Sequence, residues 1–456
     1  MLYFIITALF FILFSAQPLL VLYSFALLFT LHRLFWRDKE PKTIFFGLLL
    51  FWLSLTVKVF YSDLSGLNYE SLSESPNIVQ TAYVSLLGLT LFASGIFLGI
   101  RFKNKSSGSV KYLISQPQIF DIRKVVLVYL ATILFKIFLG SILFAIPSLS
   151  QMINAVLLLR EGFVFLLIYV YYHQRKSLLF PLLFISIEIM LGFVSYFSSF
   201  KDTIILVLIS ITYFNISLDG KKIFILSILS GLCLYLLLIW QAVKSDYRNF
   251  LSGGERAQVV TVDRATAFSQ FIELASKANI NNADLWYASI DRLSYIEFFS
   301  QATDNVPKVI PHENGKLWLN NVEHVLVPRF LNPNKPPIDD SKMVNKYATR
   351  KVAAAEDGAS FSLGFLAESY IDFGYFFMYL PIFFVGLLFG LIYSFIYNRS
   401  YNYVWGHAFT TPLWVYFNCS GTPGTKILGW LVWYSVIFIL INRYLVPKID
   451  LYLRKQ

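Results

Sequence analysis

One stretch of the sequence, residues 320–375, gathers side chains that are suited to chemistry. His324, Arg329 and Lys335 lie in its first half, and Glu368 in its second. Imidazole and carboxylate groups take or give a proton, so His324 and Glu368 are the candidate catalytic residues for activating or positioning a hydroxyl. Guanidinium and ammonium groups bind phosphate oxygens. We therefore expect Arg329 and Lys335 to bind an anionic substrate.

Other cations stand near the ends of hydrophobic segments. Lys201 ends the seventh segment, Lys244 and Arg248 follow the ninth, and Arg292 lies further into the polar region after it. Lys201, Arg248 and Arg292 join the candidate set for binding a diphosphate at the level of lipid headgroups. The alternative is that exposed lysines and arginines merely solvate a loop.

Each candidate acid or base also has a structural interpretation. His324 is a lone histidine in a predicted loop, where such a residue often serves as a hydrogen-bonding group. Glu368 could equally pair with a nearby arginine. Asp372 follows Glu368 by four positions, so both face one way if this segment is helical.

The composition defines the class of protein that must position these residues. The chain has 456 residues, of which 57% are hydrophobic and 14% charged, with mean hydropathy +0.61. Soluble domains carry about 25% charged residues, so we predict a polytopic membrane protein. The net charge of +11 then indicates basic cytoplasmic loops and contact with anionic lipid, not nucleic acid.

The hydrophobic runs predict an all-α protein with about twelve transmembrane helices. Backbone groups cannot remain unpaired in lipid, and no run shows the alternation of a barrel strand. The first and eleventh runs are the weakest of the set. The runs are 2–15, 18–32, 43–61, 79–100, 125–146, 152–171, 177–198, 203–218, 222–240, 375–397, 404–419 and 426–442.

The distribution of Lys and Arg predicts the orientation. Most basic residues of the connections fall on one side, whereas the short connections on the other side contain only Lys201. By the positive-inside rule both termini are cytoplasmic. Residues 1–240 form a first bundle of about nine spans, 241–374 a large external loop that carries the site, and 375–456 a second bundle of about three spans.

The external loop contains two predicted helices, over 264–280 and from Asp284, as N-cap, to about Ala302. On the second helix, Arg292 would share a face with Ile296 and Phe299. Six prolines between 307 and 361 exclude long helices and suggest a rigid extended path.

Five charged residues lie within the predicted spans, where each costs ~3 kcal/mol or more on insertion scales. Glu188 is the most deeply placed, and it is either a hydrogen-bond partner that stabilises the bundle or a site residue. The five are Lys58, Lys136, Arg160, Glu161 and Glu188.

Several common chemistries have no support in the sequence. There is no Walker loop, no Gly-rich dinucleotide motif, no nucleophile elbow and no clustered His/Cys set. We therefore expect no cofactor and no metal.

The 320–375 region resembles the O-antigen polymerases (Wzy-type) that polymerise oligosaccharide repeat units in bacteria. The similarity lies in Val327-Pro-Arg-Phe-Leu-Asn-Pro-Asn-Lys-Pro336, in Asn345 with Tyr347, and in Ala367-Glu-Ser-Tyr-Ile-Asp-Phe-Gly374. It covers some 55 residues, and elsewhere only the layout agrees, with about a dozen spans and one large late external loop.

This resemblance implies a metal-independent, GT-C-like glycosyltransferase in the bacterial inner membrane. It would transfer a growing glycan from an undecaprenyl-diphosphate carrier onto a new lipid-linked repeat unit, at the outer face, for an O-antigen, capsule or exopolysaccharide. A chain-length regulator and a flippase are the expected partners. The alternatives are an O-antigen ligase or other lipid-linked GT-C transferase, a flippase or other transporter, and a structural partner of an envelope assembly complex.

Overall fold

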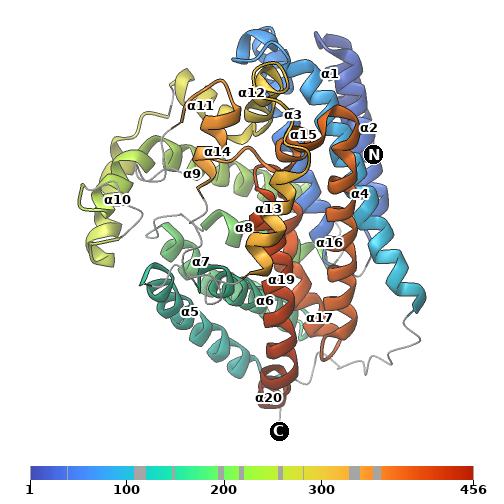
Figure 1. The fold of residues 1–456 in the computed structure, drawn as a ribbon. Coiled ribbons are helices and arrows are strands. Elements are labelled where there is room, and N and C mark those ends of the chain that lie inside the picture. The colour runs from blue at the N-terminus through green and yellow to red at the C-terminus, as the bar shows by residue number, and fades with distance from the viewer. Residues whose placement is uncertain are drawn as a thin grey trace.

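The protein is helical throughout the part that the computed structural model describes (Figure 1). The described residues are 2–38, 40–106, 120–145, 149–193, 200–214, 220–254, 260–280, 282–327, 339–352 and 361–454. Within them the only β-type contact is an isolated bridge between Phe120 and Arg454. The predicted all-α class is therefore confirmed.

Six helices in the described ranges are long and apolar enough to cross a membrane. This confirms a helical membrane-type chain, whereas the count of twelve spans stays a prediction. α1 (Leu2–Phe14), α7 (Leu179–Phe193) and α8 (Phe200–Thr212) coincide with predicted spans but have only 13, 15 and 13 residues. The six are α2 (Pro18–Phe35), α3 (Thr43–Ser65), α4 (Ile78–Ser106, of which 78–102 qualifies), α6 (Ser150–His173), α16 (Tyr379–Arg399) and the segment Gly424–Leu453, which starts with α19 (Gly424–Leu440) and ends with α20 (Val446–Leu453).

The predicted eleventh span, 404–419, is not one helix. It divides into α17 (Tyr403–Thr410), a 3₁₀ turn with Pro412 at its second position, and α18 (Trp414–Phe417). Proline lacks the backbone N–H that a continuing helix needs, which explains the break. The other two helices that occupy predicted spans are α5 (Ile122–Ala145) and α9 (Gly220–Leu251).

α4 and α16 pack side by side through glycines (Figure 1). Gly95 and Gly99 on α4 face Gly386 and Gly390 on α16. A Cβ atom at Gly390 would lie 2.2 Å from the carbonyl oxygen of Ile96. Paired small residues four apart allow this close backbone approach in membrane helices.

Replacing Gly390 with alanine is therefore expected to destabilise the protein in detergent by about 1–3 kcal/mol, the usual cost of overpacking. Gly140→Ala is the matched control, because nothing lies within 4 Å of a Cβ at this helical position. Thermal unfolding measured for both variants tests the prediction. Equal midpoints would contradict the packing argument.

The predicted external loop folds into short helices (Figure 1). The predicted helix from Asp284 to Ala302 is wrong in two respects. It is broken at Ser294 and Tyr295, so Arg292 does not share a helix face with Ile296 and Phe299, and its N-cap is Asn282, whose side chain accepts the Asp284 N–H. The helices are α10 (Arg264–Lys277), α11 (Ala283–Leu293), α12 (Ile296–Asn305), α13 (Lys316–Leu326), α14 (Asp340–Tyr347) and α15 (Phe365–Phe377).

The region between 307 and 361 is not simply extended, since α13 and α14 lie in it; only the absence of long helices is confirmed, for the described residues. Glycine at position 315 starts α13 with a positive φ of 89°.

A buried ion pair joins these short helices to the spans. Lys58 on α3 lies 2.8 Å from Glu297 on α12 and 2.6 Å from Asp291 on α11. The partners account for the charge that the sequence places inside a span.

Candidate functional site

Three predicted diphosphate-binding residues come together around Lys244. Lys201 stands in the first turn of α8, Arg248 in the last turn of α9 and Arg292 in the last turn of α11. All three act on Lys244 as neighbouring positive charges. We call these four residues the cationic cluster; Figure 1 shows the three helices that carry it.

Apolar packing fixes the helices that carry the cluster. Phe200, at the start of α8, packs with Trp240 and Tyr247 on α9 and with Phe271 on α10. Tyr247 is fully buried between the cluster residues Lys244 and Arg248. The lysine and arginine therefore project from a rigid helical segment.

The electrostatics of the cluster favour an anionic ligand. Burial, followed by the charges of Arg292, Arg248 and Lys201, lowers the pKa of Lys244 to about 7. In the described part of the chain, Lys201, Lys244 and Arg292 form no salt bridge; Lys244 donates a 2.7 Å hydrogen bond to Gln241. A bound diphosphate would offset this repulsion, because opposite charge favours the protonated amine.

A cavity of about 310 Å³ adjoins the cluster, since Asp202 follows Lys201 and lines it. Burial is the main cause that raises the pKa of Asp202, and Lys201, Glu161 and Lys136 act on it as neighbouring charges. The lining combines polar residues with aromatic rings. The lining residues are Lys136, Asn154, Leu157, Leu158, Glu161, Asp202, Thr203, Leu206, Pro412, Trp414, Val415, Tyr416 and Trp430.

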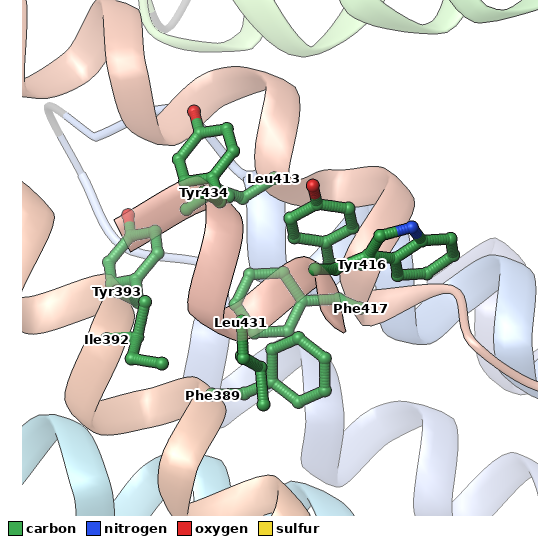
Figure 2. A pocket seen from close by; sticks show the side chains of 9 residues that line it. Phe389, Ile392, Tyr393, Leu413, Tyr416, Phe417, Leu431 and Tyr434 are labelled. Carbon is green, nitrogen blue, oxygen red and sulfur yellow. The ribbon is translucent and has the colours of Figure 1, made fainter. Parts of the chain in front are cut away.

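A stacked aromatic pair forms part of the cavity wall. Tyr416 and Trp430 stack with ring centroids 4.7 Å apart and planes 14° from parallel. Tyr416 also lines the small pocket in Figure 2, together with Leu413, Phe417 and Phe389. Its volume of about 10 Å³ leaves room for about one water molecule, so it is a packing void and no ligand site.

A buried ion network stands behind the cavity. Arg160 on α6 lies 2.8 Å from Oε2 of Glu188 on α7, and Tyr129 donates to the same oxygen at 2.7 Å. Lys136 binds both Glu188, at 2.9 Å, and Glu161, at 3.0 Å. Glu188 is therefore a hydrogen-bond and ion-pair partner within the bundle, as one of the two interpretations drawn from the sequence expected.

Glu368 lies elsewhere, at the junction of α13, α15 and α19. Its Oε2 accepts the side-chain amide of Asn321 at 3.0 Å and the backbone N–H of Gly424 at 2.8 Å, at the start of α19. Asp372 accepts the N–H groups of Leu317 and Trp318 at the start of α13. Both carboxylates hold helix N-termini, a structural role that the spacing in the sequence did not indicate.

His324 lies on α13 and not in a loop. It is partly exposed and stands three positions after Asn321, so the two share a helix face. This places His324 about one turn from the Glu368 junction. Arg329 and Lys335 lie outside the described residues.

The burial of Glu368 predicts a pH-dependent stability. Burial is the largest cause that raises the pKa of Glu368 to about 7, from about 4.3 in an unfolded chain. A raised pKa means that the folded state binds the Glu368 proton more tightly than the unfolded chain does. The stabilising contribution of the protonated carboxyl is therefore complete below about pH 4.3, and it is lost as the pH rises through about 7. The thermal midpoint of the wild type should fall over this window.

Glu368→Gln should remove that component, which can be checked by thermal unfolding at pH 5 and pH 8. Glu273→Gln, an exposed acid on α10, is the control and should retain it. An unchanged pH slope in Glu368→Gln would show that another group is responsible.

No group of three or more His, Cys, Asp or Glu side chains in the described ranges is placed to hold a metal ion. The arrangement thus consists of a cationic cluster, an adjacent cavity with carboxylates and aromatic rings, and a buried ion network behind it.

The fold and these features define a helical membrane-type protein with a cationic cluster beside a cavity of mixed polar and apolar lining. The chain belongs to the family described as a domain of unknown function, DUF8712, whose model matches residues 47–416. No curated protein and no solved structure is significantly similar to it.

Proposed function

We propose that the protein polymerises undecaprenyl-diphosphate-linked oligosaccharide repeat units at the outer face of the bacterial inner membrane. The observation that supports this best is the convergence of Lys201, Lys244, Arg248 and Arg292 from three separate helices. Clustered cations suit a diphosphate, which carries several negative charges and many acceptor oxygens. The resemblance of the 320–375 region to O-antigen polymerases points to the same substrate.

In the proposed reaction, the bond between the anomeric carbon of the donor glycan and the diphosphate oxygen breaks. The diphosphate leaves with the electron pair, and the cationic cluster stabilises its developing charge. A hydroxyl of the acceptor sugar forms the new bond to the anomeric carbon and gives its proton to a base. His324 remains a candidate for this base, whereas the hydrogen bonds of Glu368 support a structural role.

The unequal distribution of Lys and Arg between the two sets of connections supports an orientation in which the cluster and the cavity lie on the external side. The starts of α6 and α8 are both on the predicted external side, and both border the cavity. The lipid-linked donor would then reach the cluster from the headgroup region of the bilayer. A flippase would supply that donor, and a chain-length regulator would act on the same product.

Deletion of the gene tests this proposal through the length distribution of the surface polysaccharide. Loss of a polymerase should leave single repeat units on the acceptor. Chains of normal length in the deletion strain would refute the proposed function, and complete loss of attached glycan would favour a ligase.

A transporter of lipid-linked oligosaccharide is the second candidate, because of the buried network around Glu188. Charges inside membrane spans are common along transport pathways. If the protein is a transporter, its loss in the deletion strain should make lipid-linked repeat units accumulate on the cytoplasmic side. Loss of a polymerase should instead leave these units accessible from outside.

A further inference from the structure

We propose that the 310 Å³ cavity beside the cationic cluster is a saccharide subsite, which receives a sugar of the repeat unit while the cluster holds the diphosphate. This inference rests on the proposed function and deepens it by assigning a second part of the substrate to a second set of residues. Ligand sites of about 300–1,000 Å³ are common, and they combine apolar walls with a few convergent polar groups. The cavity has both features.

Glu161 lines this cavity, and one of its two carboxylate oxygens lacks a hydrogen-bond partner in the described part of the protein. Oε1 of Glu161 accepts hydrogen bonds from Lys136 and Arg160. Its Oε2 is buried and has no hydrogen-bond partner in the described part of the protein. Buried polar atoms are nearly always satisfied, and a small rotation of the Glu161 carboxylate would let this oxygen accept a hydroxyl hydrogen from a ligand in the cavity.

The other polar residues match a sugar better than a phosphate. Asp202 adds a second carboxylate, and Asn154 and Thr203 add further hydrogen-bonding groups. The ammonium of Lys136 is offset by Glu161 and Glu188. Carboxylates that line the cavity would repel a diphosphate and would accept hydrogen bonds from sugar hydroxyls. The cationic cluster would thus bind the anion, and the cavity would bind the hydroxyl groups.

Aromatic rings supply the apolar side of the subsite. Trp414, Tyr416 and Trp430 all line the cavity, and the last two form a stacked pair. Large rings of this kind give extensive contact area, and their N–H and O–H groups can still bind polar atoms. A pyranose presents C–H groups on its face and hydroxyls at its edge, which fits one aromatic wall and two carboxylates.

The position of the cavity orients a substrate that spans both sites. Asp202 lines the cavity, and Lys201, its neighbour in the sequence, belongs to the cluster. A sugar in the cavity would therefore lie next to a diphosphate at the cluster. The polyprenyl chain would remain outside, in the bilayer.

Binding measurements on the purified, full-length protein in detergent test this assignment. The probes are undecaprenyl diphosphate, for the cluster, and the free oligosaccharide released by mild acid from lipid-linked repeat units of the host, for the cavity. Asp202→Asn and Trp430→Leu should each weaken oligosaccharide binding about tenfold or more, equivalent to about 1.4 kcal/mol, and leave undecaprenyl diphosphate binding unchanged. Neither side chain takes part in a salt bridge within the described ranges.

Arg292→Ala should show the opposite pattern, and Lys277→Ala, on the exposed face of α10, should behave as the wild type in both assays. Wild-type oligosaccharide affinity in both Asp202→Asn and Trp430→Leu would overturn the subsite, even if the protein polymerises glycan. A wild-type protein that neither polymerises glycan nor binds undecaprenyl diphosphate would instead refute the proposed function. Circular dichroism and thermal unfolding exclude variants that fail to fold.

Discussion

Replacing Arg292 with alanine is expected to reduce polymer synthesis by about 10²–10³-fold, the usual effect of removing one donor that stabilises a developing negative charge. Arg292 is exposed at the end of α11 and acts on Lys244 together with Arg248 and Lys201. Its loss should therefore weaken stabilisation of the leaving diphosphate without disturbing the core. Arg292→Lys should retain part of the activity, because charge remains and bidentate geometry is lost.

The measurement is the formation of glycan ladders from lipid-linked repeat units by purified variants in liposomes. Lys277→Ala is the control, since it removes an exposed cation from a neighbouring helix. The role assigned to the cluster would be wrong if Arg292→Ala and Lys277→Ala both retained wild-type rates.

The largest effect on stability is expected for Glu188→Leu. This change removes the main partner of Arg160 and one of the two partners of Lys136, so the two cations share only Glu161 and one buried positive charge is left in excess. Breaking a buried pair from one side typically costs 3–5 kcal/mol. We therefore expect a strongly lowered thermal midpoint in detergent or failure to accumulate in the membrane.

The double variant Arg160→Met/Glu188→Leu separates the pair from the packing. It keeps the Lys136 to Glu161 salt bridge, at 3.0 Å, and replaces both members of the buried pair by apolar side chains. Such replacements are often neutral or stabilising, so the double variant should recover most of the lost stability. If it is no more stable than Glu188→Leu, the pair is not the cause.

The sequence predicted the cluster only in part. Residue type and expected position near span ends selected Lys201, Arg248 and Arg292, because a cation must remain near water. Lys244 was not among them, although the charges of all three act on it in the structure. No local signal distinguishes it, since its surroundings come from α8 and α11, far away in the chain.

The cavity could not be predicted from the sequence. Glu161 lies on α6, Asp202 on α8 and Trp430 on α19, and their proximity depends on how these helices pack. By contrast, the two glycine pairs of α4 and α16 carry a recognisable spacing of small residues. This spacing is a local signal, which the sequence contains before any packing is known.

Helix breaks show the same limit of hydrophobic pattern. Pro412 lies where the 404–419 helix is interrupted. Its neighbours are hydrophobic, so hydropathy alone predicted one continuous helix. The sequence pattern around Glu368 did not indicate that it lies at a helix terminus, where a carboxylate is a favoured partner of free N–H groups. Its hydrogen bonds to Gly424 and Asn321 supply that explanation.

The most direct test of the central claim is a reconstituted polymerisation assay. Purified protein in liposomes is supplied with undecaprenyl-diphosphate-linked repeat units extracted from the deletion strain, without nucleotide sugars and without other enzymes. The account predicts a ladder of lipid-linked glycans longer than one repeat unit, with release of undecaprenyl diphosphate in proportion to the bonds formed. Repeat units that remain single, with protein shown to be folded, would contradict it.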